Sequence, residues 1–142
     1  MTRVQIIDDL MACLGAISPE NGFQSRPAEL RRGIHLAEDL NDLPGLCLFS
    51  QRVESADQTG ARAERRLVLH LWGAAPAPQG DFRALDALAA DCLQALARPE
   101  LNPHWQATTI GDMELYEGGA ADPLGLFDLE ITVSYEAGLG EL

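Results

Sequence analysis

The sequence predicts an α+β fold with two layers, in which helices pack on one face of a mostly antiparallel sheet of four or five strands. Three observations predict it. A strongly helical segment lies between two groups of strand patterns, the last strand pattern is apolar on one side only, and 142 residues suffice for one buried core. A sheet with one wet face carries its helices on the other face. We therefore expect residues 1–142 to form a single domain, with residues 136–142 as a mobile tail.

Two helices are predicted from apolar residues that recur every three or four positions. The first spans residues 2–17, where Thr2 and Gln5 have the spacing of a capping box. Its apolar stripe consists of Val4, Ile7, Met11 and Leu14. The second spans residues 81–97, with Asp81 as its N-cap, and it shows the clearest periodicity in the chain.

The segment between the first helix and the first strand is ambiguous. Residues 23–42 contain a partial helical stripe, which predicts a short helix there. The turn at Leu43-Pro44-Gly45 then leads into a strand predicted for residues 46–53. Residues 55–64 are polar and contain Gly60, so they are expected to form an exposed hairpin loop or arm.

Residues 67–72 are predicted to form a strand that is apolar on both faces. Its two faces carry, respectively, Leu67, Leu69 and Leu71, and Val68, His70 and Trp72. A strand of this kind is expected to be central, or to have its second face covered by another subunit.

The C-terminal third predicts three more strands. Two short ones, residues 106–110 and 113–116, are separated by Gly111-Asp112, and a glycine-rich loop follows them. Residues 127–135 then alternate strictly between apolar and polar side chains, so this strand is expected to have one buried face.

The charge is distributed unevenly along the chain. The net charge is -12, and all ten basic residues are arginines. Residues 1–98 hold 13 acids and the ten arginines, a net charge of -3, whereas residues 99–142 hold nine acids and no base, a net charge of -9. This balance disfavours a nonspecific nucleic-acid binder and predicts one strongly electronegative face.

The residues that usually carry catalysis do not form a recognisable pattern here. Three well-separated cysteines lie among apolar residues and are expected to be buried, reduced thiols. The histidines have no metal-ligand spacing, and without lysine there is no phosphate-binding loop of the P-loop type. We expect no enzymatic activity, no cofactor and no metal. The start of the chain resembles neither a signal peptide nor a membrane span, which predicts synthesis in the cytosol without membrane association.

The order of these elements resembles the tail terminator proteins of long-tailed bacteriophages and related gene transfer agents. The resemblance covers roughly residues 3–136. It is carried by the amphipathic start at 4–17, the turn at 42–46, the polar arm before residues 65–71, the helix at 81–97, the acidic glycine-rich loop, and the closing strand that ends in Val133-Ser134-Tyr135.

The resemblance implies a structural virion protein that assembles into a ring with copies of itself, usually six. The ring would sit on the end of the tail tube, bind the tail tube protein, stop tube polymerisation and present a joining surface to the head-tail connector protein. It would be assembled in the host cytoplasm and reside in the virion tail. The helical stretch predicted within residues 23–40 departs from the pattern and leaves a neighbouring head-tail joining protein as an alternative.

A ring needs unlike surfaces on the two sides of each subunit. The candidate interface residues are Arg62, Arg65, Arg66, Trp72, Asp112, Glu114 and Glu117. Arginines of the arm would meet the acids of a neighbour, and an electronegative lumen would let DNA pass without specific binding. The alternative is a small ligand-binding domain or enzyme with a pocket between the sheet and its helices.

Overall fold

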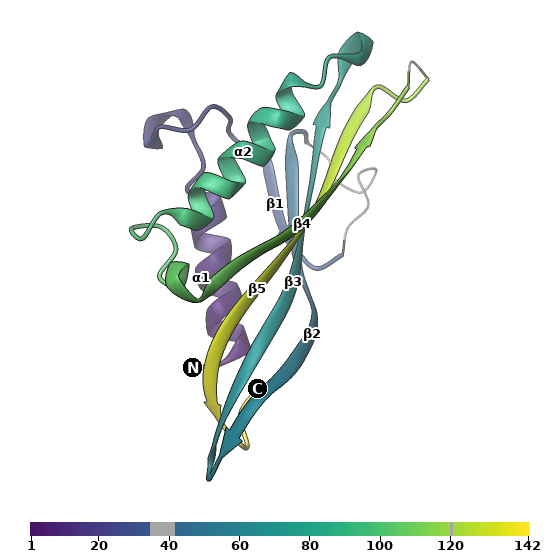
Figure 1. The fold of residues 1–142 in the computed structure, drawn as a ribbon. Coiled ribbons are helices and arrows are strands. Elements are labelled where there is room, and N and C mark those ends of the chain that lie inside the picture. The colour runs from purple at the N-terminus through teal and green to yellow at the C-terminus, as the bar shows by residue number, and fades with distance from the viewer. Residues whose placement is uncertain (35–41, 120) are drawn as a thin grey trace.

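The computed structural model describes residues 1–34, 42–119 and 121–142, and it shows a five-stranded, mostly antiparallel sheet with two helices packed against one face (Figure 1). The strand order is β1-β2-β3-β5-β4. The helices are α1 (Arg3–Gly15) and α2 (Arg83–Ala97), and the strands are β1 (Glu29–Arg32), β2 (Gly45–Thr59), β3 (Arg62–Pro76), β4 (Thr108–Glu117) and β5 (Leu124–Gly138). The predicted α+β class is confirmed.

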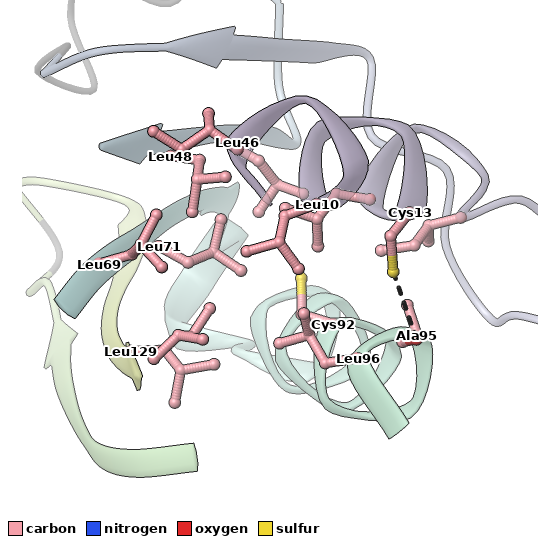
Figure 2. Packing of buried hydrophobic residues seen from close by; sticks show 14 of the residues in the cluster. Leu10, Cys13, Leu46, Leu48, Leu69, Leu71, Cys92, Ala95, Leu96 and Leu129 are labelled. Carbon is pink, nitrogen blue, oxygen red and sulfur yellow. Dashed lines mark hydrogen bonds between the residues drawn. The ribbon is translucent and has the colours of Figure 1, made fainter. Parts of the chain in front are cut away.

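The core lies between the helices and one face of β3. Leu67, Leu69 and Leu71 point to this face and are fully buried. Figure 2 shows leucines of β2, β3 and β5 packed together with Leu10 of α1 and Leu96 of α2. Each such side chain removed from water contributes about 1.5–3 kcal/mol, so this face specifies which side of the sheet receives the helices.

The first helix has the predicted cap, but its buried face is rotated. Thr2 and Gln5 form both hydrogen bonds of the capping box. Val4, expected in the stripe, is 48% exposed, whereas Ile6, outside the expected stripe, is fully buried. The reason is that α1 packs against α2 as well as the sheet, and this second contact selects a different set of side chains.

The second helix begins two residues later than predicted, at Arg83. Asp81 nevertheless acts near its start, because its carboxylate accepts a hydrogen bond from the Arg83 main-chain N–H at 3.1 Å. An acceptor there satisfies one of the N–H groups that a helix leaves unpaired at its first turn.

The short helix predicted within residues 23–42 is wrong for the described part of that segment. Glu29–Arg32 form β1, which pairs with β2 in parallel, with Leu30 opposite Leu46. The remainder of the prediction, residues 35–41, lies outside the described residues. The spacing of apolar residues in this segment is compatible with a helix or a strand, and main-chain pairing with the edge of β2 makes it a strand.

Of the two forms predicted for residues 55–64, a hairpin loop or an arm, the structure shows the arm. β2 continues to Thr59 and β3 begins at Arg62, so this region is a paired β-hairpin with a register shift between Ser55 and Asp57. Gly60 has a φ of 60°, in the left-handed region that glycine adopts readily at a tight turn. Both faces of this hairpin are largely wet, so its sequence lacks the apolar alternation that identifies a half-buried strand.

The last two strands are longer than predicted. The pieces predicted at 106–110 and 113–116 are one strand, β4, which begins only at Thr108 because residues 105–107 form a 3-10 helix, and which has a register shift between Ile110 and Met113. A Cβ placed on Gly111, inside that shift, would lie 3.2 Å from the Cβ of Glu130. β5 extends beyond its predicted end to Gly138, and thus into the segment expected to be a tail.

A fully buried carboxylate fixes the chain between α1 and β1. Asp91 of α2 is 0% exposed and accepts hydrogen bonds from Gln24 N–H at 3.1 Å, Ser25 N–H at 2.6 Å and the Ser25 hydroxyl at 2.5 Å. Several donors offset the cost of burying this charge. The contact sets the path by which the chain reaches β1.

The three cysteines are buried thiols, as predicted. Cys13 of α1 donates to the carbonyl of Ala95 in α2 at 3.3 Å (Figure 2). Burial raises the pKa of Cys13 to about 11 and also raises the pKa of Cys92. Thiols held in the protonated form are poor nucleophiles.

We expect all three thiols to resist alkylation by iodoacetamide at neutral pH in the folded protein, and to react fully in concentrated guanidinium chloride. Mass spectrometry of the two samples measures this. Rapid labelling of native Cys13 or Cys92 would contradict the burial described.

Gly73 of β3 provides a test of the core. A Cβ at this position would lie 2.0 Å from the Phe127 ring, which packs on the glycine from β5. We expect Gly73→Ala to lower the free energy of unfolding by about 1–3 kcal/mol, because a buried aromatic ring must move. Gly119→Ala is the control, since a Cβ added there would meet nothing within 4 Å. Urea denaturation of both variants measures the difference.

Candidate functional site

The arm, defined as residues 54–66, is the part of the β2–β3 hairpin that lies beyond the helix-covered core. Figure 1 shows its tip extending past the lower end of α1. β5 runs beside β3 along this whole length, as far as Arg62 opposite Gly138. The arm is therefore the outer part of a three-stranded ribbon and holds its shape through main-chain pairing.

The three candidate arginines of the arm do not form one patch. Arg65 lies on the same face as Leu67, towards the helices, whereas Arg62 and Arg66 lie on the opposite, open face, because side chains alternate along β3. Arg62 lies 3.5 Å from the Glu136 carboxylate and Arg66 3.3 Å from that of Glu54. Arg65 instead donates to the main-chain carbonyl of Glu141.

The ion pairs of the arm are exposed. The side chains of Arg62 and Glu136 are 60% and 69% exposed, and those of Arg66 and Glu54 are 46% and 35% exposed. Ion pairs in contact with water contribute little to stability and exchange partners at small cost. The arginines can therefore leave their present acceptors for those of another molecule.

Trp72, another candidate, belongs to an aromatic cluster on the open face. The centroids of its ring and the Phe49 ring lie 4.8 Å apart in a T-shaped arrangement. The Phe49 ring also stacks on the His70 ring, with centroids 5.5 Å apart. The indole N–H is buried and has no acceptor among the residues that the structure describes. Trp72 is half-buried, so it is partly a packing residue of the subunit itself.

His70 was not among the sequence candidates, although it lies at the centre of this cluster. Its Nδ1 is 2.7 Å from the Asp128 carboxylate and its Nε2 is 2.8 Å from the Gln51 side-chain oxygen. An Asp–His pair activates a nucleophile when the second ring nitrogen faces a hydroxyl or thiol. Here that nitrogen faces an amide oxygen, so the triplet positions side chains on the open face and lacks a nucleophile.

The candidate acids lie on β4, the last strand of the sheet order. Asp112, Glu114 and Glu117 are all exposed. Glu114 lies opposite Asp128 on the open face, and Asp112 lies within the register shift. Among the described residues β4 pairs only with β5, so its outer edge carries unpaired main-chain groups.

The edge strand also exposes apolar side chains. Ile110, Leu115 and Tyr116 are 40%, 55% and 50% exposed. Charged side chains on an edge strand oppose indiscriminate strand pairing, whereas large apolar side chains there favour contact with a partner. β4 therefore combines a free edge, negative charge and apolar area.

A cleft of about 340 Å³ lies between the end of α1 and β1. Its floor includes Leu14 and Leu30, and its charged groups are Arg26 and Glu29. Arg26 is paired with Glu20, and Glu29 with Arg31. The cleft lies at the β1 edge of the sheet, and a ligand site between the sheet and its helices stays a prediction.

The described residues contain no group of three or more histidines, cysteines or acids placed to hold a metal ion. None of their helices is both long and apolar enough to cross a membrane. No family model matches the sequence, and no curated protein matches it either.

The charge network of the arm provides a testable titration. Hydrogen bonds from Arg52, and then from Arg66, lower the pKa of Glu54 below its ordinary value. A lowered pKa means that the pairing is complete above the ordinary pKa of glutamate and is lost as the pH falls through the lowered value. We expect the Glu54 pKa to rise in Arg52→Gln and by less in Arg66→Gln, measured by carboxyl-detected NMR. A Glu54 pKa that did not respond to either change would contradict this network.

Proposed function

We propose that this chain is a structural subunit that assembles with copies of itself into a ring, and that the ring is the tail terminator or a close head-tail joining component of a bacteriophage or a gene transfer agent. The observation that carries the proposal is the pairing of unlike surfaces on one subunit. One end of the sheet projects an arm with three exposed or half-exposed arginines, and the last strand of the sheet presents an acidic, partly apolar free edge.

Unlike surfaces on two sides of a subunit favour closed rings. A contact in which one patch meets a different patch on the next copy repeats around an axis until the ring closes. Arginines on one side and carboxylates on the other give such a contact direction and specificity. The arm and β4 fit this requirement because β4 contains no basic residue.

The open face of the sheet supports the lumen part of the proposal. Glu114, Asp128 and Glu130 lie on this face, on β4 and β5. A ring whose open faces point inward would line its channel with carboxylates at that position. Such a channel repels the phosphates of DNA and lets it pass without binding.

The joining-protein alternative was based on a helix predicted in the segment that departs from the terminator pattern, and this basis is weakened. The departure was a predicted helix within residues 23–40, and Glu29–Arg32 form a strand. In the proposed ring, the tail tube protein binds one face and the head-tail connector protein binds the other.

Reversing the charge of the arm tests the proposal. We expect the wild-type chain to sediment as a closed oligomer, seen as rings by negative-stain electron microscopy. The triple variant R62E/R65E/R66E should stay folded and associate about a hundredfold more weakly or not at all, because carboxylates would then face carboxylates across the contact. Analytical ultracentrifugation across a concentration series measures the association.

The matched control is R26E/R32E/R83E. It changes the charge by the same amount at residues outside the arm, and all three are exposed. Circular dichroism establishes that both variants are folded. A wild-type chain that stays monomeric at every concentration, also with tail tube present, would refute the ring, and an intact ring in the arm variant would refute the arm as its contact.

A further inference from the structure

The last residues of the chain fold back onto the arm. The Leu139 N–H donates to the carbonyl of Ala61, in the turn of the hairpin, at 3.0 Å. The Tyr135 hydroxyl donates to the carbonyl of Leu142 at 2.5 Å, and Arg65 donates to that of Glu141. We call residues 139–142 the strap, because they connect the turn of the arm to its inner face.

The strap covers the helix-side face of the arm. Arg65 and Tyr135 are opposite each other on this face, and Ala63 is opposite Ala137. Ala63 and Tyr135 are 5% and 6% exposed and Ala137 is fully buried, and Tyr135 and Ala137 belong to the hydrophobic core cluster. A small apolar surface with one arginine therefore lies beneath or beside the strap.

The strap is held mainly by polar contacts. Its two leucines, Leu139 and Leu142, are 47% and 56% exposed, so they bury little apolar area. Exposed hydrogen bonds are exchanged for hydrogen bonds to water at small net cost. Displacing the strap therefore exposes little further leucine surface.

Arg65 has the weakest acceptor of the three arm arginines. Arg62 and Arg66 lie within 3.5 Å of carboxylates, whereas the hydrogen bond of Arg65 ends on an uncharged carbonyl. A guanidinium is attracted more strongly to a carboxylate than to an uncharged carbonyl, because the carboxylate carries a full opposite charge and can accept two parallel hydrogen bonds. An incoming carboxylate would therefore compete with the strap for Arg65.

We infer that the helix-side face of the arm is the docking surface for β4 of a second copy, and that the strap covers this surface in the free subunit and leaves it on assembly. The inference rests on the proposed function, since it identifies the contact between neighbouring copies. β4 fits the surface in charge, through Asp112 and Glu117, and it is an extended strand with a free edge. Its exposed Leu115 supplies apolar area for Ala63 and Ala137.

The strap then acts as an internal competitor. Only subunits with an open arm bind, so the apparent dissociation constant is the intrinsic one divided by the open fraction. The strap therefore reduces association of free subunits at low concentration. At high concentration, β4 of a neighbouring copy displaces it.

Removing the strap tests the inference. We expect a chain shortened to end at Gly138 to self-associate with an apparent dissociation constant about tenfold lower than that of the full chain, measured by analytical ultracentrifugation. Tyr135→Phe, which keeps the ring and loses the bond to Leu142, should lower it by a smaller factor and guards against misfolding of the shortened chain. Equal or weaker association of both variants would overturn the inference.

Hydrogen exchange on the intact chain gives a second readout. On assembly we expect the Leu139 amide to exchange faster, because its bond to Ala61 is broken, and the amides of Thr108–Glu117 to exchange more slowly. If rings form while Leu139 keeps its protection, the strap does not leave and the inference fails, although the proposed ring stands. If the full chain forms no ring, the proposed function fails instead.

The inference has its own test in that case. The probe is then a synthetic peptide of residues 108–117, and binding is followed by fluorescence anisotropy. We expect it to bind the chain shortened to Gly138 more tightly than the full chain. Equal binding to both, or none, would show that the strap covers no site for β4.

Discussion

The burial of one face of β3 beneath the two helices is the constraint on which the rest of the structure depends. Leu67, Leu69 and Leu71 pack under α1 and α2, and β2 and β5 flank β3 along its length. This contact fixes which face of the sheet is covered and which is open. It also limits what the helices can cover, because β3 continues well beyond them.

The exposed end of the sheet follows from this limit. Residues 62–74 of β3 are paired on both sides, but its N-terminal part, in the arm, lies beyond the core leucines. Main-chain hydrogen bonds keep the strands of the arm paired without a helix packed on them. The arm consequently presents charged side chains at fixed positions, and its inner face is covered by a few C-terminal residues instead of a helix.

The elements that sequence reasoning predicted well are those with a strong local signal. The capping box at Thr2, the periodicity of α2 and the alternation of residues 127–135 each reflect a repeated contact with the core. The length of the strands in the arm and the presence of β1 were not predicted, for the opposite reason. Most arm side chains face water and β1 has only four residues, so neither repeats an apolar contact often enough to leave a pattern.

The candidate site shows the same division. The sequence indicated the arm, the acidic C-terminal third and Trp72, because charge and residue type can be read without coordinates. It could not show that Arg65 and Arg66 face opposite ways, because that depends on the unbroken strand through the predicted loop. The contact of His70 with Asp128, 58 residues later, depends on the pairing of β3 with β5.

The sequence by itself determined the fold class, the capped helix at the start, the reduced thiols and the uneven charge, since each follows from local composition and spacing. Only the tertiary structure decided the parallel placement of β1, the length of the arm, the free edge of β4 and the return of the last residues onto Arg65. These features arise from contacts between residues far apart in the chain. Most of these contacts are main-chain hydrogen bonds, which form whatever the side chain is and therefore leave no pattern in the sequence.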